Sequence, residues 1–598
     1  MGIAYLIISA ILIIAFIAVK KSDKKQNLVF WAILSIVLYF IYNTFVAYCL
    51  SIVKIPCNLI SFTIINTIII FLLAFNIFVK KRTQKYYIKA IDIVAVVILL
   101  VITIAIGYKQ YGFPLNIKYT TTDPAVHYMA AKKFYENSTL LSNVEKDTLY
   151  DFKTFMPASY VNTGLLFKAF DGFINYLDFY KIYIIFDLIC LFMMAATFYI
   201  MVISFMKRKS FYIFGLVGAI IYALGYPVDV LTYGFAYLGM GVLIINAMIA
   251  VCKMFEEKEV NIHICKVILA MLAFGLFFSY YLFMPVIYLS IGIYFIFLYK
   301  KGKYIISKEA VITIIQTLVI PCILGCIYFI LPSLLGNGEN YENAIASEGA
   351  IYRNLYGNFI FFIPFVLHYL ITCIKNKKIT LENAILIILL IFMLALFILG
   401  MKDKVSSYYF YKNYYILWSI VIYIFICELY QLSKKDITLP IAVLSTYVVL
   451  IVFTVTGLDK KIYNKNYMWG QENVSNTVTN IYQFNLDKLN KNNITFTNQE
   501  MQIIKKLYEI IPMETPVWIV DAKLEQLWFY SITEQTCHNS LDGFYLEDYI
   551  DISAWNNKQC EYLIYFNTTD YWHANKEQIL KDTTTIFENE YGGIIKNN

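Results

Sequence analysis

Fourteen apolar blocks are spread along this 598-residue chain. Most of the blocks hold about 17–25 residues, which is the length that an α-helix needs to cross a bilayer. Hydrophobic residues make up 60% of the chain and charged residues only 15%, whereas soluble domains have about 45–50% apolar and 25% charged residues. The pattern excludes a soluble enzyme, a disordered chain and a small disulfide-framework protein. It predicts an α-helical polytopic membrane protein with about 14 transmembrane helices.

The blocks themselves predict the membrane spans, with ends placed to within about 2–4 residues. Their limits are Ile3–Val19, Leu28–Cys49, Leu59–Val79, Ile91–Gly107, Ile182–Phe205, Phe211–Leu224, Leu231–Val251, Val267–Leu282, Met284–Leu298, Val311–Leu335, Phe359–Ile374, Ala384–Gly400, Tyr414–Leu432 and Leu439–Gly457.

Basic clusters follow every odd-numbered block. Because Lys and Arg are enriched in cytoplasmic loops, the odd gaps are predicted to face the cytoplasm and both termini to lie outside the cell membrane. The net charge of +8 is thus a topology signal, and no nucleic-acid partner is expected, since no basic stripe or binding motif accompanies it. The clusters are Lys20, Lys21, Lys24 and Lys25; Lys80, Lys81 and Arg82; Lys207, Arg208 and Lys209; Lys253, Lys258 and Lys266; Lys300, Lys301 and Lys303; Lys375, Lys377 and Lys378; and Lys434 and Lys435.

The run from Val267 to Tyr299 is apolar almost throughout. As one helix it would be about 50 Å long, against a hydrocarbon core of about 30 Å. Basic residues flank both of its ends. We therefore predict a tight hairpin near Phe283-Met284-Pro285.

The predicted organisation has four parts: spans 1–4 in residues 1–107, a first large outside loop in 108–181, spans 5–14 in 182–457, and an extracytoplasmic α/β domain in 458–598. In the last part, Thr497-Asn498-Gln499-Glu500 matches a capping box that opens a helix. Pro516–Val520 and Tyr562–Phe566 are predicted strands. Their alternation with helices indicates a small layered sheet.

The segment that begins Thr121-Thr122-Asp123-Pro124 carries the most information about chemistry. Asp followed by Pro is typical of an N-cap and first helical turn, so a helix is predicted to about Tyr135. His127 then shares a face with Asp123. By spacing alone, Asp123 is either a helix cap or a carboxylate held at a membrane-facing cleft. In the second case it would deprotonate an acceptor hydroxyl or hold a divalent cation against a phosphate.

An Asp motif in the first large outside loop that leads into a surface helix resembles the GT-C superfamily of integral membrane glycosyltransferases. Phe155-Met156-Pro157, further along the same loop, resembles the Met-Pro stretch of these enzymes. So does the arrangement of many spans followed by an external α/β domain. The resemblance implies transfer of a sugar from a polyprenyl-phosphate donor to an extracytoplasmic glycan, lipid or protein acceptor. It implies that Asp123 is catalytic, that His127 lies at the substrate, and that Mg²⁺ or Mn²⁺ is a candidate cofactor held by Asp123.

A donor of this kind needs a cation for its phosphate, and the second outside region supplies Arg353. The arginine fork matches phosphate oxygens. The alternative is an ordinary interfacial anchor. Glu342 in the same region is a candidate second acid at the substrate.

The third candidate lies just before the thirteenth span, in the run Tyr408-Tyr409-Phe410-Tyr411-Lys412. Lys412 is a positive charge on the outside, against the topology trend. A lipid phosphate would interact favourably with this charge, and Tyr411 would help to line a sugar or prenyl groove. The alternative is an aromatic belt at the membrane interface.

The sequence thus favours a glycosyltransferase of a bacterial-type cell envelope, with Asp123 as base or metal ligand and Arg353 and Lys412 on the donor phosphate. The rival is a transporter or flippase for polysaccharide or lipid-linked sugar, which would place polar groups near the bilayer midplane. Asp187 is the clearest acid inside a span, and it fits either a functional role or an interhelical hydrogen bond. A polysaccharide polymerase or ligase is a third reading.

Overall fold

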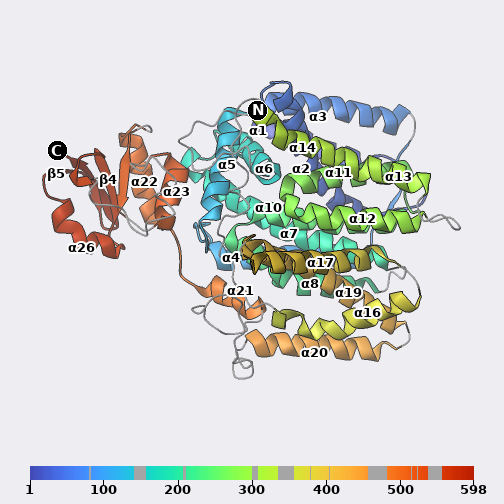
Figure 1. Cartoon of the computed structure of the whole chain (residues 1–598). Helices are drawn as coiled ribbons and strands as arrows, with labels where there is room; N and C mark the ends of the chain where they lie inside the picture. Colours follow the sequence, from blue (N-terminus) through green and yellow to red (C-terminus); the bar gives the residue numbers. More distant parts are fainter. Residues whose placement is uncertain are drawn as a thin grey trace.

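The structure is a computed structural model of the whole chain. It describes residues 1–79, 82–140, 156–206, 211–299, 307–334, 356–376, 379–402, 404–434, 436–455, 481–512, 515–520, 523–535 and 555–598. A large bundle of helices is followed by a separate α/β unit that lies against one end of it (Figure 1).

The bundle confirms the predicted polytopic membrane architecture. In the described residues, ten helices are long and apolar enough to cross a bilayer, and three further apolar helices are shorter. Counting the long run Ile262–Leu298 as its two helices gives fourteen apolar segments. They fall where the fourteen apolar blocks predict them.

The helices of the bundle run through the chain in the order α1 to α20, with helices α5 and α6 inserted after α4. Their bounds are α1 Gly2–Ala18, α2 Leu28–Ile52, α3 Leu59–Ala74, α4 Ala90–Tyr111, α5 Asp123–Asn137, α6 Ala158–Phe170, α7 Phe179–Phe205, α8 Tyr212–Leu224, α9 Tyr226–Tyr233, α10 Ala236–Glu256, α11 Ile262–Tyr280, α12 Met284–Leu298, α13 Lys308–Ile314, α14 Ile320–Leu334, α16 Ile363–Lys375, α17 Leu381–Gly400, α18 Ser407–Lys412, α19 Tyr414–Ser433 and α20 Thr438–Val455.

The predicted hairpin is present between α11 and α12. A short 3₁₀ turn, Tyr281–Phe283, separates the two helices, and Met284-Pro285 opens the second. The Tyr288 hydroxyl donates a hydrogen bond to the Ala273 carbonyl at 2.7 Å. In one continuous helix these residues would be about 22 Å apart, so the chain reverses direction here.

Three of the predicted cytoplasmic loops meet at one end of the bundle. The Lys20 amide donates to the Arg82 carbonyl at 2.9 Å, and the Asn261 amide donates to the Lys21 carbonyl at 2.9 Å. The N-terminus lies at the opposite end, where Gly2 is packed so closely on Ala169 that a β-carbon would sit 1.8 Å from its carbonyl oxygen. These three odd gaps therefore share one end, as the charge pattern predicts. Which side of the membrane that end faces stays a prediction.

The C-terminal unit is the predicted layered sheet, with two strands, β5 and β6, beyond the two that were predicted. Its four strands lie in the order β3, β4, β6, β5, with β3 and β4 parallel and the other two pairs antiparallel. Helix α22 opens with the predicted capping box between Thr497 and Glu500. The bounds are α22 Asn498–Ile510, β3 Val517–Val520, α23 Lys523–Thr533, β4 Tyr562–Phe566, α26 Asp570–Ile579, β5 Thr583–Asn589 and β6 Gly592–Asn597.

Strand β6 was missed because Gly592-Gly593 opens it and only Ile594 and Ile595 are apolar. The two glycines are needed because β6 lies directly against Tyr565 of β4. A β-carbon on Gly592 would come within 2.2 Å of the Tyr565 carbonyl oxygen.

Helix α21, Ile481–Asn490, lies before this unit and packs on the bundle. The Lys488 ammonium forms a buried ion pair with Asp229 of α9 at 3.0 Å. The Tyr415 hydroxyl of α19 donates to the other Asp229 oxygen at 2.8 Å. The chain downstream of the last span is thus fixed to the end of the bundle that carries α5.

Candidate active site

The stretch that precedes α5 is hydrogen-bonded to the end of α9. The Thr120 amide and hydroxyl both donate to the Thr232 carbonyl at 3.1 Å, and the Thr121 hydroxyl donates to the Tyr233 carbonyl at 3.0 Å. Gly234 follows with a φ of +69°, and a β-carbon there would meet Pro124 at 2.2 Å. The start of α5 is therefore held against a position that only glycine fits.

Asp123 is the first residue of α5, and the expectation that its side chain caps the helix is wrong. Thr122 is the N-cap residue, and no side-chain cap hydrogen bond is present at this end of the described helix. The Thr122 carbonyl accepts from the Ala125 amide at 3.1 Å. Pro124 holds the first turn because its φ is already helical. The carboxylate is thus left available for a role other than capping.

The Asp123 carboxylate lies deep at the end of the bundle, although part of the residue is still accessible. Burial raises the pKa of Asp123, and the nearby Lys412 ammonium opposes that rise. A carboxylate whose pKa is raised is a better proton acceptor near neutral pH than an ordinary one. Asp123 also lies within electrostatic reach of the hydroxyls of Tyr237, Tyr280 and Tyr408.

Lys412 lies near Asp123 in space, although the two residues are far apart in the sequence. Its side chain is only 2% exposed, and the ammonium donates a hydrogen bond to the Tyr237 hydroxyl. It also lies over aromatic rings, a favourable setting for a cation. The ring centroids lie at 4.0 Å for Tyr408, 4.5 Å for Phe235, 4.9 Å for Tyr237 and 5.3 Å for Tyr280. We call these four rings the Lys412 cage.

His127 lies one turn after Asp123, as the i+4 spacing predicts. Its ring centroid is 4.4 Å from that of Tyr237 in the Lys412 cage. Burial, with a further contribution from Lys412, lowers the pKa of His127 to about 3. The imidazole is therefore neutral at physiological pH and adds no charge to the site.

Among the described residues, Tyr411 and Asp187 are the other residues that the sequence singled out, and neither belongs to the Lys412 cage. Tyr411 is buried beside Lys412 in sequence, but its ring stacks on Tyr414 at 6.0 Å. The predictions for Arg353 and Glu342 lie outside the described residues. Asp187 of α7 accepts a hydrogen bond from the Tyr119 hydroxyl at 2.7 Å. Tyr119 lies in the non-helical stretch between α4 and α5, so this bond joins a span to a loop and not two helices.

Sequence reasoning missed Phe235, Tyr237 and Tyr280, which form most of the cage. Each lies at the end of an apolar helix: Phe235 and Tyr237 where α10 begins, and Tyr280 where α11 ends. An aromatic residue at a helix end is common in membrane proteins. The sequence signal therefore could not separate these three from the many other interfacial aromatics.

The described residues contain no group of three or more His, Cys, Asp or Glu side chains that could hold a metal ion. Near Asp123, the candidate ligand that the sequence identified among the described residues is the neutral imidazole of His127. The Lys412 ammonium would repel a divalent cation at the same place.

No family model matches the sequence, and no curated protein matches it. Among solved structures, the chain is similar to two crystal structures of the Archaeoglobus fulgidus oligosaccharyltransferase. One is a complex with Zn and sulfate, at 10% identity and a TM-score of 0.43, covering 78% of this chain and 68% of that one. The other is tethered by a disulfide bond to an acceptor peptide with the NVT sequon, at 10% identity and a TM-score of 0.44, covering 79% and 69%.

Proposed function

We propose that the chain is a membrane glycosyltransferase that uses a lipid-phosphate-linked sugar, with a polyprenyl phosphate as carrier. The acceptor is a glycan, lipid or protein outside the cytoplasm. Asp123 accepts the proton of the acceptor hydroxyl while that oxygen attacks the anomeric carbon. The bond from the anomeric carbon to the phosphate oxygen breaks, and the lipid phosphate leaves with its added negative charge.

The observation that carries this proposal is that the Lys412 ammonium lies within electrostatic reach of the Asp123 carboxylate. A base and a cation are the two groups that glycosyl transfer from a phosphate ester requires. The cage keeps the Lys412 ammonium out of water, and an ammonium in such a setting stabilises a developing phosphate charge more strongly than one in bulk solvent. Pro124 and Gly234 fix the base on one side of the site, and the cage fixes the cation on the other.

A divalent cation is not needed for either step as written. Asp123 supplies one carboxylate and Lys412 already supplies positive charge, so we route no step through Mg²⁺ or Mn²⁺. Loss of transfer on addition of a chelator, with recovery on Mg²⁺ or Mn²⁺ addition, would assign Asp123 to metal binding instead.

The rival function is transport of a lipid-linked sugar without chemistry. Transporters bind substrate near the bilayer midplane, on broken helices. Asp123 and Lys412 lie instead at helix ends, at the start of α5 and at the end of α18. This placement favours a reaction at the membrane surface over passage through the bundle.

The experiment is a transfer assay in proteoliposomes with a polyprenyl-phosphate sugar labelled in the sugar. A transferase releases unlabelled polyprenyl phosphate and moves the label to the acceptor, or to water when no acceptor is present. A transporter moves the intact labelled lipid across the membrane and leaves the sugar–phosphate bond uncleaved. Intact donor after many turnovers of transport would reject the proposal.

A further inference from the structure

Two adjacent cavities lie at the end of the bundle opposite to Asp123. The larger has a volume of about 560 Å³ and the smaller about 130 Å³, and Lys24 and Glu259 line both. Helix α1 separates this end from Gly2, and a helix of 17 residues is about 25 Å long. Neither cavity therefore belongs to the candidate active site.

In the lining of the larger cavity, basic residues outnumber acidic ones. Five basic residues and two acids surround it, so the lining carries an excess of positive charge. The basic residues are Lys20, Lys21, Lys24, Arg82 and Lys258, and the acids are Asp23 and Glu259. They come from three loops that are far apart in sequence.

Two of the five cations have hydrogen-bond or ion-pair partners within the protein. Lys20 pairs with Asp23 at 2.5 Å. The buried Lys21 ammonium donates to the carbonyls of Phe16, Ile17 and Val19, at 2.6, 2.9 and 2.8 Å, and so closes the end of α1. Within the described part of the chain, no ion pair is recorded for Lys24, Arg82 or Lys258. Three exposed cations thus face the cavity with Glu259 as the acid beside them.

The loops that carry these cations are built as an ordered scaffold. Gln84 is buried, and its side-chain oxygen accepts from the Lys21 and Ser22 amides at 2.8 and 2.9 Å. Its nitrogen donates to the Lys24 carbonyl at 2.8 Å. Residues Gln26–Asn27 and Tyr86–Tyr87 pair as a short parallel sheet. A topology signal needs only positive charge in a loop, so this order calls for a further explanation.

The smaller cavity adds an apolar wall to the basic one. Trp31 and Phe30 of α2 line it together with Tyr212 and Met254. A ligand that spans both cavities would place an anionic group among Lys24, Arg82 and Lys258 and an apolar part against these side chains.

We propose that this end of the bundle holds a second binding site, specific for a phosphate group, formed by Lys24, Arg82 and Lys258. Three cations that converge from separate loops match the charge and the several oxygen acceptors of a phosphate. The source of the phosphate is an anionic phospholipid headgroup or a free phosphate of the aqueous phase. The headgroup fits the apolar wall of the smaller cavity.

The test uses the full chain, purified in neutral detergent and stripped of lipid. Phosphatidylglycerol, phosphatidylcholine and inorganic phosphate are added separately. Bound lipid is counted by native mass spectrometry, and thermal unfolding is followed for all three. The variant is R82Q/K258Q, both of whose positions are exposed. The matched control is K375Q/K434Q, which removes two exposed cations from other odd gaps that line neither cavity.

The expected result is that phosphatidylglycerol binds the wild type and the control about tenfold or more tightly than R82Q/K258Q. Phosphatidylcholine should show no such difference. Stabilisation of the wild type and control by inorganic phosphate alone, absent in R82Q/K258Q, would support the site and assign it to free phosphate. Equal behaviour of all three proteins toward both anionic probes would overturn the proposal.

Discussion

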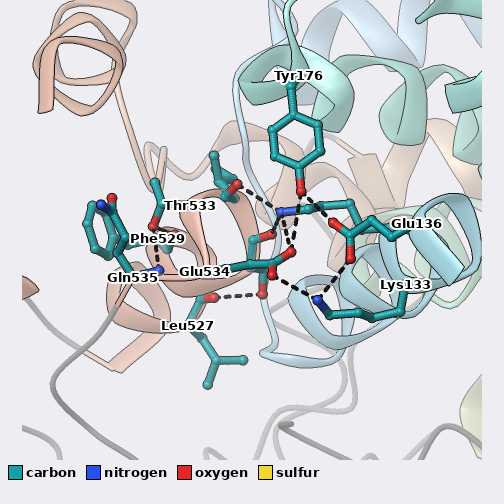
Figure 2. Close-up of polar contacts among 11 residues, drawn as sticks. Lys133, Glu136, Tyr176, Leu527, Phe529, Thr533, Glu534 and Gln535 are labelled. Carbon is teal, nitrogen blue, oxygen red and sulfur yellow. Dashed lines mark hydrogen bonds and ion pairs between the residues drawn. The ribbon is translucent and has the colours of Figure 1, made fainter. Parts of the chain in front are cut away.

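The Lys132 ammonium of α5 lies 3.1 Å from the Glu534 carboxylate at the end of α23, and the lysine side chain is fully buried. It also donates to the carbonyls of Ser531 and Ile532 at 3.0 and 2.9 Å. Around it, Glu534 pairs with Lys133 at 2.8 Å, and the Tyr176 hydroxyl donates to both Glu136 and Glu534 (Figure 2).

Because α5 also begins with Asp123, one helix joins the candidate base to the C-terminal unit. Asp123 and Lys132 are about 14 Å apart along this helix. The stack of Trp528 on Tyr119, at 5.8 Å, adds an aromatic contact between α23 and the stretch before α5. A change in how the unit docks would therefore reach the active site through a single rigid element.

The first prediction is that Glu534→Gln loosens the C-terminal unit from the bundle. It leaves the buried Lys132 ammonium without its carboxylate, a change that costs about 3–5 kcal/mol when one partner of a buried pair is removed. Limited proteolysis and hydrogen exchange of α23 should both show it. The control is Glu509→Gln, which breaks an exposed pair with Lys506 and should change neither. Equal protection of α23 in both variants would contradict a role for the Lys132–Glu534 ion pair in docking.

The same ion pair predicts a pH dependence. Lys132 and Lys133 hold the pKa of Glu534 at about 2, against the opposing effect of burial, and the unfolded value is about 4.3. A carboxyl whose folded pKa is depressed contributes stability that is present above the unfolded pKa. Docking should therefore weaken as the pH falls from about 4.3 toward 2, and Glu534→Gln should remove this dependence.

The second prediction compares two glycines with a positive φ. Gly172 has a φ of +81° and open space around it, whereas a β-carbon at Gly234 would meet Pro124 at 2.2 Å. Both Ala variants carry a backbone cost of about 1–2 kcal/mol. Only Gly234→Ala should also displace Asp123 and lower transfer, by about a hundredfold for a shift of 1 Å. Equal rates in the two variants would mean that the start of α5 tolerates movement.

The third prediction concerns Lys412. Lys412→Met keeps the length of the side chain but removes the charge. The activation free energy for donor turnover should therefore rise by about 1.5–3 kcal/mol. The control is Lys404→Met, because Lys404 is an exposed lysine of the same loop. The measurement is kcat/KM for the lipid-linked donor. Comparable values for both variants would make Lys412 a packing residue of its cage.

The fourth prediction is the orientation in the membrane. Single cysteines at Lys506 and Lys258, both exposed, lie at opposite ends of the molecule. A membrane-impermeant thiol reagent applied to intact cells should label Lys506→Cys and spare Lys258→Cys. The opposite pattern would place Asp123 in the cytoplasm and remove the proposed acceptors from its reach.

Much of the fold follows from the sequence because apolar length and loop charge are strong local signals. The hairpin at Met284-Pro285 and the capping box at Thr497 are of this kind. The sequence also assigned Lys412 and Asp123 to the same reaction. The reason was that Lys412 is a basic residue in a loop predicted to lie outside, where basic residues are less common. The sequence did not predict that Glu534 pairs with Lys132. No local pattern in either segment indicates a contact between residues so far apart in the chain. The register of Asp123 was off by one residue, since a cap and a first-turn acid look alike in a Thr-Asp-Pro sequence.

The central claim is tested most directly by Asp123→Asn in the donor-cleavage assay, with Asp171→Asn, an exposed acid at the same end, as control. Asn keeps the shape and removes the charge, so cleavage should fall by about 10²–10⁴-fold while folding is kept. In the wild type, the cleavage rate should rise with pH through the raised pKa of Asp123, since the carboxylate is the active form. This rise with pH should be absent in Asp123→Asn. A folded Asp123→Asn protein that cleaves donor at the wild-type rate, with the same pH profile, would contradict the assignment of Asp123 as the catalytic base.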